Sequence, residues 1–143
     1  MQTLITDFFE QDHHRLDQIF AEFQQNKQDT EKAIELFSQF KTGLIQHIQW
    51  EEELLFPSVE SAAGFPPNAG PTAVMRMEHI QIKDCLSLIE KQLNQAGDTA
   101  AMEAQLTHIL SGHNMKEENI LYPMSDESIP TDTAQTIIAQ CRG

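Results

Sequence analysis

Two segments of this chain repeat the same ionisable residues at a constant spacing. Residues 47–57 and residues 113–123 both read His-x-x-x-Glu-Glu-x-Leu/Ile-Leu-Phe/Tyr-Pro, and they lie 66 residues apart. The same interval separates His13 from His79, each of which follows an acidic residue. Histidine and glutamate are common metal ligands, so the repeat predicts a metal site with two related halves. The six candidate ligands are His13, His47, Glu51, His79, His113 and Glu117.

The His-x-x-x-Glu spacing is suited to a helix. Residues i and i+4 lie on one side of a helix about one turn apart, so each His–Glu pair can reach one common site. His13 and His79 each add one imidazole from a facing helix. Imidazole and carboxylate together suit iron, manganese, zinc or copper. The only two cysteines, Cys85 and Cys141, form no Cys-x-x-Cys motif, which argues against structural zinc held by thiolates.

The number of candidate ligands favours two metal ions over one. If Glu51 and Glu117 each bridge two ions, each ion receives about four protein atoms, and a bridging oxide or hydroxide raises this to about five. Octahedral ions such as iron would then keep a position open for a small molecule. A single zinc ion would not use six ligands. We therefore expect two iron ions with a bridging oxide or hydroxide.

The alternative is that these residues are ordinary polar groups of a helical core. A single buried histidine is more often hydrogen-bonded than bound to a metal. Six titratable groups converging on one core are a different case, because burying even one of them without a partner costs several kcal/mol. One pair of metal ions would satisfy all six at once, so the metal site is the favoured interpretation.

The elements that carry these residues are predicted from the spacing of the apolar residues. Four series advance by alternating steps of four and three residues, the period of one buried face of a helix. In each series the candidate ligands occupy positions that are ordinarily apolar. The series are Phe9, His13, Leu16, Phe20 and Phe23; Phe40, Leu44, His47, Glu51 and Leu54; Met75, His79, Ile82, Leu86, Ile89 and Leu93; and Leu106, Leu110, His113, Glu117 and Ile120.

Breaking and capping residues set the boundaries of the helices. Pro57 is expected to kink the second helix, and Asp98 to cap the fourth. After Pro130, Thr131 or Asp132 can cap a short fifth helix, which we expect to pack on the bundle. Its shared face contains Ala134, Ile137, Ile138 and Cys141. The long helices are expected at roughly residues 3–26, 30–62, 72–94 and 98–123, with residues 64–71 as the central loop.

Short connections between long helices predict antiparallel neighbours. The expected fold is therefore all-α: an antiparallel up-down-up-down four-helix bundle with an internal twofold repeat and a short C-terminal fifth helix. At 143 residues the chain is expected to form a single domain, residues 1–143, which is large enough to bury a core.

Composition narrows the possible partners and the cellular setting. The net charge of −13 argues against nucleic acid and anionic membranes, which both require basic patches. No apolar run is long enough to cross a bilayer, and Asp7 and Glu10 interrupt any signal-peptide pattern. Two cysteines without a local pair argue against a disulfide framework, so a reducing cytoplasm is the expected location.

With these motifs in place, the chain resembles the hemerythrin superfamily, and specifically the bacterial HHE cation-binding domains. The resemblance covers roughly residues 5–125. It rests on Asp-His-His-Arg-Leu at 12–16, Glu-Glu-Glu-Leu-Leu-Phe-Pro at 51–57, Gly-Pro at 70–71 with Glu-His at 78–79, and Glu-Asn-Ile-Leu-Tyr-Pro at 118–123. It implies an antiparallel four-helix bundle that holds a non-haem di-iron centre.

The departures from oxygen-carrying hemerythrins are informative. Those proteins have a second histidine one turn before the ligand of the third helix, where this chain has Met75. Their fourth helix carries His-x-x-x-x-Asp, whereas this chain has the shorter His-x-x-x-Glu. The four-His, two-Glu pattern is more similar to di-iron proteins that repair iron–sulfur clusters, and to the iron- and oxygen-sensing domain of an F-box protein. The repair proteins also have an N-terminal region with adjacent cysteines, which does not appear before the first predicted helix here.

The favoured function is binding or sensing of dioxygen, nitric oxide or peroxide, or of iron status, at a di-iron centre. The alternatives are an enzyme that repairs iron–sulfur clusters by donating iron or that reduces peroxide, and a protein that stores iron. Whether the protein is an enzyme is left open. A small diatomic ligand or peroxide is the expected partner.

Several neighbouring residues are assigned other roles. His14 points about 100° away from His13 around the helix, so it is expected at the surface or as a support to the ligands. His108 has no counterpart in the repeat and is expected at the surface. Glu52 and Glu118 either orient ligands or are solvated. Tyr122 is interpreted mainly as core packing, with contact to the metals as the alternative.

Overall fold

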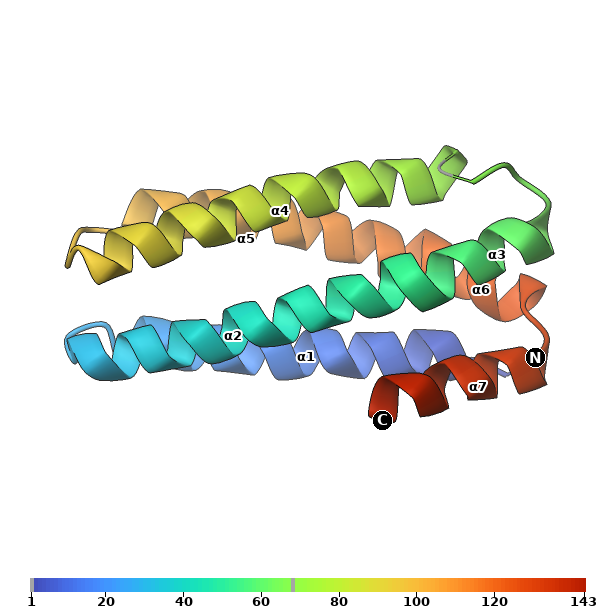
Figure 1. The fold of residues 1–143 in the computed structure, drawn as a ribbon, viewed down its shortest axis with the longest axis horizontal. Coiled ribbons are helices and arrows are strands. Elements are labelled where there is room, and N and C mark those ends of the chain that lie inside the picture. Colours follow the sequence, from blue (N-terminus) through green and yellow to red (C-terminus); the bar gives the residue numbers. More distant parts are fainter. Residues whose placement is uncertain (1, 68) are drawn as a thin grey trace.

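The computed structural model describes residues 2–67 and 69–143, and within them the chain is helical with no strand. The all-α prediction is confirmed. The elements are α1 (Leu4–Gln25), α2 (Thr30–Trp50), η1 (Glu51–Leu55), α3 (Phe56–Ala63), α4 (Gly70–Asn94), α5 (Ala100–Lys116), η2 (Glu117–Leu121), α6 (Tyr122–Ser128) and α7 (Thr131–Arg142). The helices join end to end into four long rods, which are α1, α2–η1–α3, α4 and α5–η2–α6. The rods lie side by side, and the short α7 lies alongside α1 (Figure 1).

The second and fourth rods are each interrupted by a π-helical turn, η1 and η2, which the sequence analysis did not predict. The amide of Phe56 donates to the carbonyl of Glu51, and the amide of Tyr122 donates to the carbonyl of Glu117, each five residues back. Pro57 and Pro123 each lie two residues after a turn. Proline lacks an N–H group, so neither residue can make the ordinary helical hydrogen bond. The predicted kink at Pro57 is therefore a π-helical turn, and single π turns are frequent at functional sites.

These turns correct the predicted apolar faces. The extra residue in a π turn rotates everything after it around the helix axis. Ile120, assigned to the core series, is 54% exposed, whereas Leu121 is buried. In the second rod, Leu55 is fully buried in place of the predicted Leu54, which is only partly buried. The glutamates that begin the two turns remain inside the bundle.

The core consists of two apolar clusters with a polar layer between them. One cluster, at the end where α7 packs, includes Phe9, Leu55 and Tyr122. The other, toward the opposite end, includes Leu16, Phe23 and Leu86. Because Phe9 and Leu16 belong to different clusters, His13 lies between them on α1. The candidate ligands therefore occupy a layer that is sealed by apolar residues on both sides.

Contacts between the rods are uneven. α1 packs on α2, α4 packs on α5, and α2 packs directly on α4, while α6 packs against both α1 and α3. α7 packs against α1, as expected, and buries the predicted face of Ala134, Ile137, Ile138 and Cys141. None of the described helices is long and apolar enough to cross a membrane.

The predicted boundaries differ from the structure in three places. The fourth rod continues through α6 to Ser128 rather than ending near Pro123, because Pro123 lies in the first turn of α6, where proline is tolerated. The third rod begins at Gly70 rather than near residue 72, because Pro71 is tolerated in the first turn of a helix. The N-cap of α5 is Thr99 rather than Asp98, although the Asp98 carboxylate does accept a hydrogen bond from the amide of Ala100. The predicted central loop, residues 64–71, includes Asn68, which lies outside the described residues.

Candidate metal centre

The structure brings all six sequence-predicted ligands together in the polar layer. His13 comes from α1, His47 from α2, His79 from α4 and His113 from α5. Glu51 and Glu117 begin the two π turns. The glutamates are fully buried, and none of the four histidines is more than 4% exposed. Residues that are 104 positions apart in the sequence, such as His13 and Glu117, have side-chain atoms 3.1 Å apart.

These side chains form two groups of four, and the two groups share both glutamates. One group is His13, His47, Glu51 and Glu117, and the other is Glu51, His79, His113 and Glu117. Within each group one ligand atom per residue lies within 4.8 Å of the others. A carboxylate has two oxygens and can contribute one to each group. The geometry therefore offers two adjacent four-ligand sites with two bridging carboxylates.

Each histidine has one nitrogen directed to the centre and the other bonded to an outer carboxylate. The Nδ1 atom of His13 lies 2.7 Å from Glu118, and that of His79 lies 2.7 Å from Glu52. His47 and His113 use Asp12 at 2.8 Å and Glu78 at 2.9 Å. A carboxylate that accepts from Nδ1–H leaves Nε2 free as a ligand and fixes the orientation of the ring. This is the usual arrangement around histidines that bind metals.

Sequence reasoning found part of this outer layer. Glu52 and Glu118 were expected either to orient ligands or to be solvated, and they contact the ligand histidines. Asp12 and Glu78 were noted as part of the repeat but received no role. The repeat was the signal that could have found it, because these two acidic residues are also 66 positions apart. Their contact with histidines of the neighbouring rods is visible only after folding.

The buried carboxylates of the centre favour positive charge beside them. Burial alone would lower the pKa of His47, but the Glu51 carboxylate and the hydrogen bond to Asp12 raise it to about 10. Burial likewise opposes protonation of His79, yet the nearby Glu51 carboxylate and the hydrogen bond to Glu52 raise its pKa to about 9. Burial raises the pKa of Glu51, but the charge of His47 and the contacts with Glu117 and His79 together hold it well below the usual range. Metal cations would supply the positive charge that these carboxylates favour.

Several atoms of the centre make no hydrogen bond in the described part of the chain. They are Oε1 of Glu51, Nε2 of His79 and Oε2 of Glu117. Glu51 Oε1 and His79 Nε2 are 3.1 Å apart, but they are not aligned as a hydrogen bond. Buried polar atoms without partners are costly and rare in folded proteins. A metal ion bonded to these three atoms removes that cost, so the residues present fit a metal site.

Tyr122 is the one tyrosine of the chain, and its hydroxyl lies inside the centre. The hydroxyl oxygen is 2.5 Å from Glu51 Oε2 and 3.0 Å from Glu117 Oε1. It is also 3.3 Å from the Nε2 atoms of His13 and His47. Of the two interpretations considered from sequence, packing alone is insufficient, because the side chain also makes polar contact with the candidate ligands.

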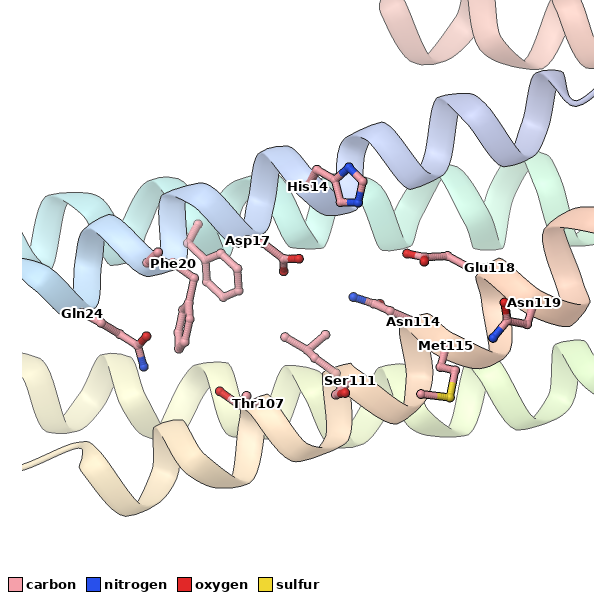
Figure 2. A pocket seen from close by; sticks show the side chains of 13 residues that line it. His14, Asp17, Phe20, Gln24, Thr107, Ser111, Asn114, Met115, Glu118 and Asn119 are labelled. Atoms are coloured by element: carbon pink, nitrogen blue, oxygen red, sulfur yellow. The ribbon is translucent and has the colours of Figure 1, made fainter.

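A surface cleft of about 540 Å³ runs between α1 and α5 beside the centre. Asp17 and Phe20 on α1 face Asn114 and Glu118 across the gap (Figure 2). Glu118 is 27% exposed and also bonds His13, so it connects the cleft to the ligand layer. The cleft is wide enough for a small molecule to approach the outer layer of the centre.

The remaining histidines lie apart from the centre. His14 and His108 are both exposed, as expected, and His14 lines the cleft rather than the core. Cys85 and Cys141 are free and buried, and neither belongs to the groups of side chains that could hold a metal among the described residues.

Comparison with known proteins matches the sequence of this chain to a described family. The family model for the hemerythrin HHE cation-binding domain matches residues 4–125. A DNA nickase from Nostoc sp. (strain PCC 7120) is 31% identical over 118 residues, which cover 82% of this chain and 32% of the nickase. The chain thus spans about a third of the length of that curated relative. No solved structure matches the chain.

Proposed function

The chain belongs to the hemerythrin HHE cation-binding family, and we propose that it is a non-haem di-iron protein that binds or senses dioxygen, nitric oxide or peroxide. The observation that carries this proposal is that the two four-residue groups share Glu51 and Glu117. Two ions bridged by two carboxylates account for every ligand atom in the layer. The proposed ligands are His13, His47, Glu51, His79, His113 and Glu117.

Iron is the metal that this set of ligands supports best. Nitrogen and oxygen donors without thiolate suit ions that accept six ligands, and zinc in structural sites is normally four-coordinate. We propose two iron ions with a bridging oxide or hydroxide. When bound, such a pair of ions supplies redox chemistry and open coordination positions for small molecules.

The protein side chains around the centre restrict what can react there. The ligand layer lies between two apolar clusters, and the glutamates have no exposed surface. A large substrate therefore cannot touch the metals, whereas the cleft between α1 and α5 gives a diatomic molecule or peroxide access to Glu118, the outer carboxylate that contacts His13. The outer carboxylates hold the four imidazoles in place, so ligand binding needs little rearrangement of the protein.

The same features weigh against iron storage and iron donation. A protein that releases iron readily needs ligands that move, but here every ligand histidine is bonded to a second carboxylate. Peroxide reduction is the enzyme alternative that the buried site accommodates. Steady-state consumption of peroxide by the purified protein separates that alternative from binding or sensing.

The similarity to a DNA nickase carries no nicking activity to this chain by itself, since most of the nickase lies outside the matched part. The net charge of −13 and the buried ligands both weigh against contact with DNA phosphates. We keep the expectation that the chain binds neither nucleic acid nor membrane. The free cysteines are compatible with the proposed cytoplasmic setting.

We also propose the antiparallel up-down-up-down order for the bundle, within one domain of residues 1–143. The turns that join α1 to α2 and α4 to α5 lie at one end of the molecule, and the connection from α3 to α4 lies at the other (Figure 1). Each of the four histidines pairs with an outer carboxylate, and the pairs in one half have counterparts at the same repeat positions in the other half. This agreement supports the internal twofold repeat.

Metal analysis combined with spectroscopy tests the proposal. Protein purified after iron-replete expression is expected to contain about two irons per chain, as the bridged four-ligand groups require. The ferric form is expected to show oxo-bridged absorption in the near ultraviolet, and the reduced form should change its spectrum on adding nitric oxide. Zinc alone, or iron near one per chain, would contradict the dinuclear centre. Unchanged spectra with nitric oxide, oxygen and peroxide would contradict the role in ligand binding.

A further inference from the structure

The two halves of the centre differ at the residue that follows each π turn. Tyr122 follows η2, and Phe56, which is 66 residues earlier, follows η1. The Tyr122 ring lies 5.8 Å from the His13 ring, and the Phe56 ring lies 5.8 Å from the His79 ring. The two rings therefore occupy equivalent places in the repeat. Only Tyr122 carries an oxygen there.

The Tyr122 oxygen faces more polar atoms than a hydroxyl can serve. Four ligand atoms, two carboxylate oxygens and two imidazole nitrogens, lie between 2.5 and 3.3 Å from it. A hydroxyl donates one hydrogen bond and accepts at most two, so it cannot satisfy all four atoms at once. These four atoms belong to the same four-residue group, His13, His47, Glu51 and Glu117. The phenol thus lies where a cation held by that group would gain another oxygen ligand.

The other half of the centre has the complementary feature. Phe56 stacks on His79 with an angle of 10° between the rings and offers no donor or acceptor. Two of the buried atoms without a hydrogen-bond partner, His79 Nε2 and Glu117 Oε2, belong to this half, and the third, Glu51 Oε1, lies beside His79. The protein thus supplies an extra oxygen to one group and leaves the other group short of partners.

We propose that Tyr122 is a seventh protein ligand, binding through its phenolate oxygen to the ferric ion held by His13 and His47. This inference rests on the proposed dinuclear iron centre. On coordination the phenol loses its proton to solvent, and the Tyr122–Glu51 hydrogen bond is replaced by bonds from both oxygens to iron. Tyrosinate is an established ligand of ferric iron in other protein sites.

A seventh ligand makes the two ions unequal. With two imidazoles, two glutamate oxygens, the bridge and the phenolate, the ion of the His13 group has about six ligands and is saturated. The ion of the His79 group has about five and keeps an open position. A small external ligand is therefore directed to the ion held by His79 and His113, beside Phe56. The specificity of the centre would depend on that apolar neighbour.

The composition of the chain makes the test unusually clean. Tyr122 is the only tyrosine, so any phenolate signal must come from it. The ferric wild-type protein is expected to show a visible phenolate-to-iron charge-transfer band. Excitation within that band should enhance the ring vibrations of a bound phenolate in resonance Raman spectra. Tyr122→Phe should lose both signals while keeping about two irons per chain, because the six other ligands remain.

The matched variant is Phe56→Tyr, which places a phenol at the equivalent position of the other half. It is expected to strengthen the visible band and to weaken binding of azide, used as the probe ligand, relative to the wild type. Phe56→Leu, which adds no oxygen, should leave the band unchanged. Azide binding to Phe56→Tyr as tight as to the wild type would show that the open position is not beside residue 56.

The outcomes distinguish this inference from the proposed function. Two irons per wild-type chain without a phenolate band would overturn the role of Tyr122 and leave the dinuclear centre standing. Absence of bound iron would overturn both. If Tyr122→Phe fails to fold, the wild-type spectra still decide, because the chain has no second tyrosine to confuse them.

Discussion

At two faces of the bundle a helix of the first half lies beside a helix of the second half: α2 beside α4, and α1 beside α5. The repeat relates these two faces, but they are built differently. α2 packs directly against α4, and the ion pair of Lys41 with Glu90, 2.8 Å apart, joins them. The equivalent face between α1 and α5 is open, and the equivalent residues are Thr107 and Gln24, which both line the cleft. Loss of the ion pair on one side coincides with the opening of that side.

The comparison extends into the packing next to the ligands. Ile48, beside His47, is buried, whereas its counterpart Asn114, beside His113, lines the cleft (Figure 2). Inside the centre Phe56 and Tyr122 are both fully buried, and they differ in the hydroxyl that only Tyr122 carries. The six ligands are identical in the two halves, while the residues around them are not. This difference teaches that the repeat defines how metal is held, and that the residues outside the ligand set make the two halves behave differently.

The largest expected effect is on the two shared glutamates. Replacing Glu51 or Glu117 by Ala removes a carboxylate that belongs to both four-residue groups, so both variants should lose the dinuclear centre equally. Iron per chain is the measurement, and we expect it to fall from about two to one or fewer. The control variants are His14→Ala and His108→Ala, which remove exposed histidines and should keep the full iron content. Full occupancy in either glutamate variant would mean that the ligands are wrongly assigned.

Removal of the metal should come next in size. Without metal, both halves leave buried carboxylates and imidazoles with incomplete partners, so chelation should lower the melting temperature by on the order of 10 °C or more. The measurement is thermal unfolding of the metal-loaded and the chelated protein. Melting curves that coincide would indicate that the bundle needs no metal for its stability.

The outer carboxylates provide a test with one variant in each half. Asp12→Asn and Glu78→Gln both weaken the acceptor that orients a ligand histidine, and each should reduce metal affinity by about 10- to 100-fold. We expect the larger loss for Asp12→Asn, since Asp12 is 9% exposed and serves the more buried His47. Competition with a chelator of known affinity measures both. Equal affinity to the wild type in the two variants would remove the orienting role of this layer.

The smallest expected effect comes from closing the cleft between α1 and α5. The double variant Gln24→Glu with Thr107→Lys copies the Lys41–Glu90 ion pair of the α2–α4 face into the cleft. The new pair should narrow the cleft, so binding of a small ligand to the metal-loaded protein should become slower. Stability should change by no more than about 1 kcal/mol, because such pairs are partly exposed. Stopped-flow measurement of azide binding is the readout, with Lys41→Ala on the closed face as the control. A rate that is unchanged by the double variant would place the route to the centre elsewhere.

Much of the candidate site followed from the sequence, because a helix converts spacing into position. A His-x-x-x-Glu pair must lie on one side of a helix, and its repetition after 66 residues requires two such sides. The same periodicity predicted the four long rods and the buried face of the fifth helix. Those inferences needed no knowledge of how the rods pack, and the structure contains the six side chains in one buried layer.

The tertiary structure decided what spacing cannot express. The π turn at Glu51 moved the core face from Leu54 to Leu55, and the turn at Glu117 moved it from Ile120 to Leu121. One extra residue in a turn rotates the helix in a way that a regular period does not describe. The pairing of Asp12 with His47 joins residues 35 positions apart on different rods, so it depends on how α1 and α2 pack. The sequence alone determined which candidate ligands lie on the buried faces of their helices, since helical spacing fixes that. Packing decided which residues pair across the rods, which nitrogen points inward and which face of the bundle lies open to solvent.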